Sequence, residues 1–314
     1  MRKNYLTLFT IFFGTMAFSL LSLSTAEAAP IVYESMSYQT GAGQLHGQTA
    51  DAGLGAWNVN PTGSGQIISS GMSYTDTNGN ILPVAGNRYE TVAGFNDLAR
   101  ASIDVTGGGW SATNIDSGKL NAKGAEIWFS ALMNANGNTH NHFHLDFTDT
   151  DNGNNSWANG PGYFAIGKTT GNNNWELRGD NDDGDSDVQT FSSVSVTDDT
   201  FIVGRLLTDA TTGDTTLDAW FNPLIDDVSN LGIPEASITI LANNDGSVTQ
   251  FNTLGYRHQK WESPNLLDEI RMGETFNSIV GLADTVAAVP EPSTFALAAL
   301  GLLGLGWFSR WRKR

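Results

Sequence analysis

Residues 125–133 read AEIWFSALM, and this stretch decides the class of fold. Apart from Glu126 and Ser130, every residue in it is apolar, so apolar and polar residues do not alternate. A short apolar run without alternation is typical of a strand that is buried on both faces. No helical period of useful length occurs between residues 29 and 289. The stretch therefore predicts a central strand of an all-β domain.

Shorter runs of the same kind surround this stretch, separated by clusters of Gly, Asn, Asp, Ser and Thr, which favour turns. In one of them Ala101, Ile103 and Val105 share a face. About a dozen short strands without intervening helices indicate a β-sandwich or a barrel. The predicted strands are residues 31–35, 66–74, 100–105, 125–133, 142–147, 162–167, 175–178, 188–196, 201–207, 216–221, 237–241 and 266–272.

The N-terminus has the three parts of a secretory signal peptide. Arg2 and Lys3 are basic, residues 6–23 are apolar, and Ala26-Glu27-Ala28 is a small-x-small cleavage site before Ala29. We therefore predict a signal peptide at residues 1–28 and an exported domain after it. The alternative is a membrane helix that is retained in the mature protein.

The C-terminus carries a second export feature. Residues 289–293 read VPEPS, residues 294–308 form an uncharged and largely apolar run, and four Lys or Arg follow. Fifteen helical residues span roughly 22 Å, less than the hydrocarbon core of about 30 Å. The basic cluster places the C-terminus in the cytoplasm by the positive-inside rule. By itself this segment is a marginal tail anchor.

The order of these three features resembles the PEP-CTERM sorting signal of exported bacterial proteins. The resemblance implies that an exosortase-type protease cleaves within the motif formed by Val289, Pro290, Glu291 and Pro292. It also implies transient insertion into the inner membrane of a Gram-negative bacterium and delivery to the cell envelope, the cell surface or the extracellular matrix. Residues 283–289 are then a linker, and residues 290–314 are the sorting signal with a short transmembrane helix.

Composition excludes several functions. Between residues 30 and 289 there are 10 Lys and Arg against 31 Asp and Glu, a net charge near −21. Nucleic acid and anionic lipid both require basic surface and are not expected as partners. The chain has no cysteine, which excludes disulfides, thiolate metal sites and cysteine catalysis.

A second resemblance covers residues 29–282. Four segments in order are similar to laminin-G and concanavalin A-like jelly-roll domains: residues 33–57, 63–74, 217–223 (LDAWFNP) and 267–273 (LDEIRMG). The resemblance implies two stacked antiparallel sheets, one convex and one concave. In many relatives the concave face or its rim binds glycan.

Three histidines gather in residues 140–146 (HNHFHLD). On a strand, His140, His142, His144 and Asp146 share one face. This face is either a polar surface with hydrogen-bonded histidines or a glycan contact through His142 and His144. A transition-metal site is the third possibility, because two histidines at i and i+2 can share an ion. A further ligand would then come from Asp146, His46 or His258.

The tryptophans divide into two groups. Trp128 and Trp220 lie in predicted strands and are expected in the core. Trp157 and Trp175 stand among Asn and Gly, where an exposed ring could stack on a sugar while the amides bind its hydroxyls. Packing within hairpins is the alternative.

Two acidic turns could supply oxygen ligands for a structural calcium ion, which needs six to eight oxygens. Neither has EF-hand spacing, so solvated loops are the alternative. The candidate ligands are Asp149, Asp151, Asp180, Asp182 and Asp185.

Catalysis is not expected. The Glu-x-Asp-x-x-Glu strand of jelly-roll glucanases is missing from the sequence. Asp268 and Glu269 are adjacent, so on a strand they point to opposite faces, whereas Glu269 and Arg271 read as an ion pair on one face. We therefore expect a non-catalytic polysaccharide-binding module. The alternatives are a structural or adhesive biofilm coat component without a small ligand and a diverged glycoside hydrolase.

Overall fold

The structure is a computed structural model. It describes residues 29–60, 65–92, 97–107, 109–135, 142–149, 162–168, 171, 173–181, 183, 188–259 and 264–282. These residues form two large antiparallel sheets, and the predicted all-β sandwich is confirmed.

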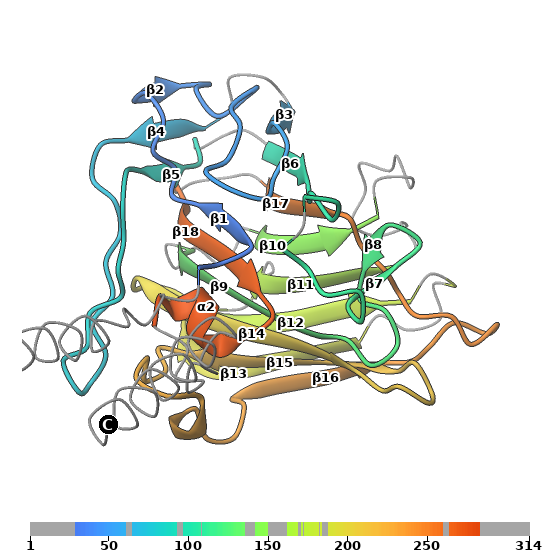
Figure 1. The fold of residues 1–314 in the computed structure, drawn as a ribbon. Coiled ribbons are helices and arrows are strands. Elements are labelled where there is room, and N and C mark those ends of the chain that lie inside the picture. Colours follow the sequence, from blue (N-terminus) through green and yellow to red (C-terminus); the bar gives the residue numbers. More distant parts are fainter. Residues whose placement is uncertain are drawn as a thin grey trace, which may run out of the picture. The chain divides into compact units, whose positions relative to one another are not determined.

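Nine strands form the first sheet, with β9 and β18 at its centre (Figure 1). Its spatial order is β16 (Ala236–Ile240), β15 (Thr215–Phe221), β14 (Thr200–Thr208), β9 (Glu126–Asn134), β18 (Leu266–Gly273), β5 (Arg88–Glu90), β4 (Gln66–Ile68) and β2 (Gly41–Ala42). The ninth strand, β1 (Val32–Glu34), pairs with β18.

Seven strands form the second sheet, and β10 lies in its middle. The order is β13 (Val188–Ser195), β12 (Asn174–Asp180), β11 (Tyr163–Lys168), β10 (His142–Thr148), β17 (Thr253–Gln259), β6 (Asp97–Ser102) and β3 (Asn58–Asn60). The other described elements are the hairpin of β7 (Ile115–Asp116) and β8 (Lys119–Leu120), the 3-10 helix η2 (Val228–Asn230) and the helix α2 (Phe276–Val280).

The main core lies between the two sheets. Strand β10 contributes Phe143, Leu145 and Phe147, all fully or almost fully buried. Strand β9 contributes Phe129 from the opposite sheet, and its ring centroid is 4.7 Å from that of Phe147. The alternation of apolar and polar residues along β10 thus places its apolar side chains on the face that packs in the core.

A second apolar cluster covers the other side of the nine-stranded sheet. It contains Trp128 and Leu132 of β9 and Trp220 of β15, and the two tryptophan rings stack with centroids 5.8 Å apart. Helix α2 packs against β9 and β18 (Figure 1). Ser130 is the polar exception in the run, and its hydroxyl donates to the Ile279 carbonyl at 2.9 Å. Residues 127–133 are therefore buried on both faces, as the apolar run predicts, whereas Glu126 near its start is exposed.

Two expected strands differ from the observed ones. The strand expected at residues 66–74 ends at Ile68, and the chain leaves the sheet to place Met72 and Tyr74 in the second cluster. The strand expected at residues 100–105 runs from Asp97 to Ser102 instead. Strand β17 was not predicted, because its outward positions carry Gly255 and Arg257 and its apolar residues are few.

The predicted signal peptide and residues 283–314 lie outside the described residues. Over the described part of the chain, no helix is both long and apolar enough to cross a membrane.

Candidate functional site

Strand β10 places its histidine and carboxylate on the face turned away from the core. His144 and Asp146 occupy this outer face, as the alternation predicts. Their exposed fractions are only 0% and 6%. The face is polar, but these two side chains do not stand free in solvent.

His144 reaches across the neighbouring strand. In the sheet, His144 pairs with Gly167 of β11, which in turn pairs with Glu176 of β12. The imidazole Nε2 lies 2.8 Å from the Glu176 carboxylate, and both side chains are buried. A Cβ atom at Gly167 would lie 2.0 Å from the Phe143 carbonyl oxygen, so only glycine fits beneath the pair. His144 is engaged in a buried contact, which corrects its assignment as a glycan contact.

Asp146 reaches across the strand on the other side. It pairs with Gly255 of β17, where a Cβ atom would lie 2.5 Å from its Oδ1. Burial raises the pKa of Asp146 to about 6, and the charges of Arg100 and Arg257 act in the opposite direction. Its Oδ1 accepts no hydrogen bond from the described residues.

Three arginines occupy outer positions around this carboxylate. Arg100 on β6 and Arg178 on β12 lie in the same cross-strand row as Asp146, and Arg257 on β17 pairs with His144. All three side chains are half-buried. Burial lowers the pKa of Arg257 to about 10, so it remains a cation at neutral pH. This face thus holds three of the 10 Lys and Arg found between residues 30 and 289.

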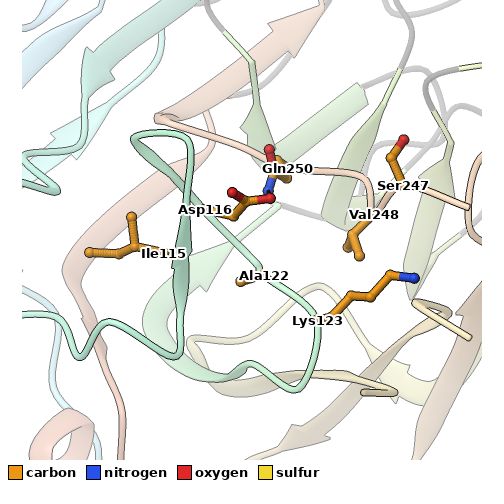
Figure 2. A pocket seen from close by; sticks show the side chains of 7 residues that line it. All are labelled: Ile115, Asp116, Ala122, Lys123, Ser247, Val248 and Gln250. Carbon is orange, nitrogen blue, oxygen red and sulfur yellow. Dashed lines mark hydrogen bonds between the residues drawn. The ribbon is translucent and has the colours of Figure 1, made fainter. Parts of the chain in front are cut away.

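A pocket of about 410 Å³ opens between the β7–β8 hairpin and the segment before β17. The Gln250 amide donates to Asp116 Oδ2 at 3.2 Å, and the Ser117 hydroxyl donates to Asp116 Oδ1 at 3.0 Å. Figure 2 shows Asp116 and Gln250 together at the centre. The lining residues are Ile115, Asp116, Ala122, Lys123, Ser247, Val248 and Gln250.

Lys123 is the cation of the pocket, and it is exposed. Its Cε would lie 3.1 Å from a Cβ atom at Gly213, so its aliphatic stem crosses the chain at that glycine. The buried side chain of Val248 provides an apolar patch near Ser247 (Figure 2). The lining therefore combines a carboxylate, an amide, an ammonium and a hydroxyl with the apolar side chains of Ile115, Ala122 and Val248. No motif indicates this site, because its residues come from two distant segments of the chain.

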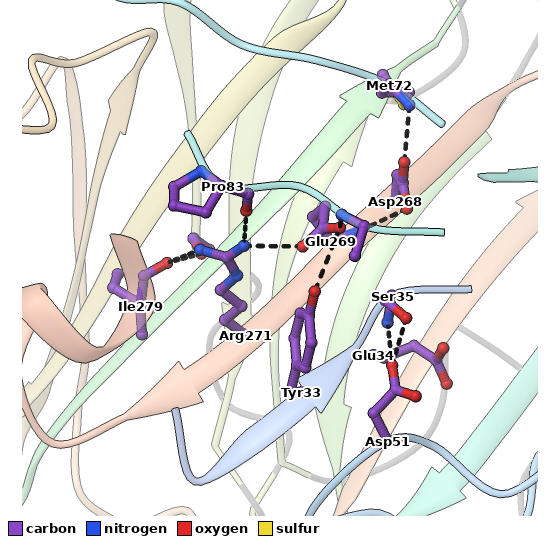
Figure 3. A network of polar contacts seen from close by, with 12 residues as sticks. Tyr33, Glu34, Ser35, Asp51, Met72, Pro83, Asp268, Glu269, Arg271 and Ile279 are labelled. Atoms are coloured by element: carbon purple, nitrogen blue, oxygen red, sulfur yellow. Dashed lines mark hydrogen bonds and ion pairs between the residues drawn. The ribbon is translucent and has the colours of Figure 1, made fainter. Parts of the chain in front are cut away.

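A third group of polar residues lies around a β-bulge in β18 (Figure 3). Glu269 has φ 52°, a left-handed conformation, and the register shifts between Asp268 and Arg271. Asp268 accepts from the Met72 amide at 2.7 Å, and burial raises its pKa to about 8. The predicted ion pair of Glu269 with Arg271 is confirmed at 2.8 Å. The bulge, however, breaks the simple alternation that the sequence suggested.

Glu34 is a further buried carboxylate nearby. It accepts hydrogen bonds from the Met36 amide at 2.7 Å, the Tyr38 hydroxyl at 2.5 Å and the Trp57 indole at 2.6 Å. Burial raises the pKa of Glu34, and these donors oppose that rise. Asp51 accepts from both the amide and the hydroxyl of Ser35. These carboxylates hold loops to the sheet.

The structure tests the predictions for three of the four tryptophans. Trp128 and Trp220 are in the core, as predicted. Trp175 is fully buried, stacks on Phe221 with ring centroids 6.3 Å apart, and donates to the Thr200 hydroxyl at 3.3 Å. The prediction of an exposed Trp175 is therefore wrong, because the Asn-rich turn precedes a strand whose first inward residue is this tryptophan. Trp157 lies outside the described residues.

The metal candidates are only partly described. Asp149 forms an ion pair with Lys119, and Asp180 is half-buried at the end of β12. His46 Nδ1 accepts from the Val59 amide, and His258 Nδ1 lies 2.5 Å from the Asn265 amide. Within the described ranges, no three His, Asp or Glu gather to hold a metal ion. Outside these ranges lie His140, the side chain of His142, Asp151, Asp182 and Asp185.

Comparison with known proteins identifies the C-terminal segment. The family model for the PEP-CTERM protein-sorting motif matches residues 288–313, which confirms the predicted sorting signal. No curated protein matches the chain in sequence.

Solved structures match the sandwich at low identity. An endo-1,3-β-glucanase from Streptomyces sioyaensis is 11% identical over 78% of this chain and 95% of its own, with a TM-score of 0.38. The lectin UEA-II, solved with galactose, is 8% identical over 78% and 100%, with a TM-score of 0.39. A β-glucanase from Bacillus licheniformis is 7% identical over 76% and 100%, with a TM-score of 0.41. Two of these three proteins are glucanases and one is a lectin.

Proposed function

Because the chain carries a PEP-CTERM sorting motif at residues 288–313, we propose that it is an exported substrate of an exosortase-type protease. After processing it would belong to the cell surface or the extracellular matrix of a Gram-negative bacterium. We further propose that its β-sandwich is a non-catalytic module that binds extracellular polysaccharide. The single observation that carries this second proposal is the open pocket around Asp116 and Gln250.

The pocket has the chemistry that a sugar requires. Its volume of about 410 Å³ suits a small part of a chain, and small-molecule sites typically occupy about 300–1,000 Å³. The paired carboxylate and amide of Asp116 and Gln250 offer acceptors and a donor in one place for hydroxyl groups. Val248 offers an apolar contact for the C–H face of a sugar ring, and Lys123 adds donors at the rim.

Two features support a non-catalytic role. Glycoside hydrolysis needs a pair of carboxyl groups on either side of the scissile bond. The lining of the pocket supplies one, Asp116, and both of its oxygens already accept hydrogen bonds. The strongly perturbed carboxyl of Asp268 is fully buried, and there it accepts backbone hydrogen bonds from Met72 and Glu269.

A glycan array followed by thermal melting tests the proposal. A polysaccharide that binds only the folded state must raise the melting temperature. We expect Asp116→Asn and Gln250→Ala to weaken binding at least tenfold. Asp198→Asn is the matched control, because Asp198 is exposed and does not line the pocket.

Two results would contradict the proposal. If no polysaccharide binds at millimolar sensitivity, and deletion still weakens biofilm cohesion, the protein is a structural coat component. Release of reducing sugar by the purified protein would instead make it a glycoside hydrolase. Calcium at the acidic turns of Asp149 and Asp180 stays a prediction from the sequence. It is tested by melting the protein with calcium and with a chelator.

A further inference from the structure

The chain around the pocket carries more carboxylates than ammonium groups. Three segments border the pocket, residues 114–123, 209–214 and 242–250. Their carboxylates belong to Asp116, Asp209, Asp214 and Asp245, and their ammonium groups belong to Lys119 and Lys123. Lys119 forms an ion pair with Asp149, which lies outside these segments. A ligand at the pocket therefore meets net negative charge.

The turn of residues 209–214 reaches the pocket at Gly213. A Cβ atom at Gly213 would lie 3.1 Å from Lys123 Cε and 3.2 Å from Val248 Cγ2, and both of these side chains line the pocket. Asp209 is exposed at the start of this turn, and its carboxylate accepts from two backbone amides of the turn, both at 2.7 Å. These hydrogen bonds hold the pKa of Asp209 below its usual range, and the charge of Lys123 acts in the same direction.

Asp245 is the second exposed carboxylate beside the pocket. It accepts from the amide of Ser247 at 2.8 Å, and Ser247 is a lining residue. Hydrogen bonds from Ser247 hold the pKa of Asp245 below its usual range, and the charge of Lys123 lowers it further. Asp209 and Asp245 are therefore ionised at neutral pH, and both attract the ammonium of Lys123. The positive charge of the lining is thus balanced by two carboxylates.

The buried side chain of Asn121 ties the three segments together. It belongs to the first segment and directly precedes the lining residue Ala122. Its amide nitrogen donates to the Thr249 carbonyl of the third segment at 2.8 Å. Its amide oxygen accepts from the hydroxyl of Thr208, the residue before Asp209, at 2.7 Å. The charges around the pocket are therefore held in fixed positions relative to its lining.

A sugar that carries a carboxylate would be repelled here, whereas a sugar that carries only hydroxyl groups would not. Two unit charges about 7 Å apart in water repel by about RT, a factor of roughly three in affinity for each carboxylate. We propose that the pocket binds an uncharged sugar residue and rejects uronates, and that Asp209 and Asp245 set this preference. Unfavourable charge placed against the wrong ligand is a common source of specificity. The inference rests on the proposed polysaccharide binding and names the class of polysaccharide.

The test uses affinity electrophoresis of the whole purified protein with polymers that share a backbone and differ in charge. The two pairs are methyl-esterified polygalacturonate with polygalacturonate, and dextran with carboxymethyl-dextran. At low ionic strength we expect the neutral polymer to bind about tenfold more tightly than its acidic partner, and salt should reduce this ratio by screening. The double variant Asp209→Asn and Asp245→Asn should lower the ratio at least fivefold. Asparagine keeps an acceptor oxygen, so the hydrogen bonds to the turn amides can persist.

The matched control is the double variant Asp198→Asn and Asp199→Asn, which removes two exposed charges that do not line the pocket. An equal change of the ratio in both double variants would overturn the inference, because the repulsion would then come from the whole domain. If the first double variant does not fold, Asp245→Asn alone must lower the ratio at least twofold. Equal or tighter binding of the acidic polymer by the wild type would also overturn the inference and leave the proposed function intact. If neither pair binds, glycan-array hits confined to neutral glycans support the inference, hits that include uronates overturn it, and no hit removes both proposals.

Discussion

Replacing Gly167 by alanine tests how the outer face is built. An alanine Cβ would lie 2.0 Å from the Phe143 carbonyl oxygen and 2.6 Å from the His144 Cα, both of them backbone atoms of β10. These atoms cannot move aside as a flexible side chain would. Strands β10 and β11 would have to separate by about 1 Å from their usual spacing of about 4.8 Å.

The expected cost follows from what this separation breaks. About two ladder hydrogen bonds would be weakened, at about 1 kcal/mol each, and overpacking adds about 1–3 kcal/mol. Some of the contact between His144 and Glu176 would be lost as well. We therefore expect Gly167→Ala to lower the free energy of unfolding by about 3–5 kcal/mol. That is a large part of the 5–15 kcal/mol that is typical of a folded domain.

Urea unfolding followed by tryptophan fluorescence measures this cost. The control is Gly255→Ala, whose Cβ would meet the Asp146 side chain at 2.5 Å but no backbone atom closer than 3.1 Å. Its cost should be smaller, and Asp146→Ala should relieve part of it. His144→Ala should not relieve Gly167→Ala, because the backbone contacts remain. Equal stability of Gly167→Ala and the wild type, or equal costs at both glycines, would refute the reasoning.

Three further predictions concern the buried groups. Burial raises the pKa of Asp268 to about 8, so the folded state keeps a proton that the unfolded chain releases near pH 4. Its contribution to stability is therefore complete below about pH 4 and decreases by up to about 1.4 kcal/mol per pH unit until about pH 8. Asp268→Asn should remove this slope in urea titrations at pH 5, 7 and 9, and an unchanged slope would contradict the assignment. Glu34→Gln leaves one acceptor oxygen for three donors and should cost about 2–4 kcal/mol by the same assay, with a changed near-ultraviolet signal from Trp57. Trp128→Ala, in the second apolar cluster, should lower the free energy of unfolding by about 3–5 kcal/mol. The control Ile233→Ser, at a side chain that is 89% exposed, should change it by less than about 0.5 kcal/mol. Similar effects at both sites would show that the second cluster does not stabilise the fold.

Much of the sandwich could be predicted because apolar patterning is local. The run at residues 125–133 and the alternation of β10 each follow from which residues must avoid water, and both are observed. Strand β17 was not predicted because it carries Gly255, which weakens the strand pattern, at the position where the Asp146 side chain approaches its backbone. A glycine inside a strand signals a close approach, but the sequence does not say which side chain approaches.

The sites could be predicted less well. The spacing in the sequence placed His144 on the outer face. It could not show that the His144 imidazole forms a buried contact with the carboxylate of Glu176, two strands away. The polar neighbours of Trp175 left two alternatives, a ring exposed to sugar or a ring packed within a hairpin, and the structure shows that the ring is buried in the core. The pocket joins Asp116 to Gln250, which are 134 residues apart, so no local motif could reveal it.

Local sequence was enough to identify the sorting motif, which matches residues 288–313, and to assign the domain to the all-β class, because both depend on neighbouring residues. The tertiary structure decided which polar groups are buried, which carboxylates hold loops, and where Arg100, Arg178 and Arg257 share a face. Those outcomes depend on strands that are distant in the chain. Their physical cause is sheet register, which brings one row of side chains together across five strands.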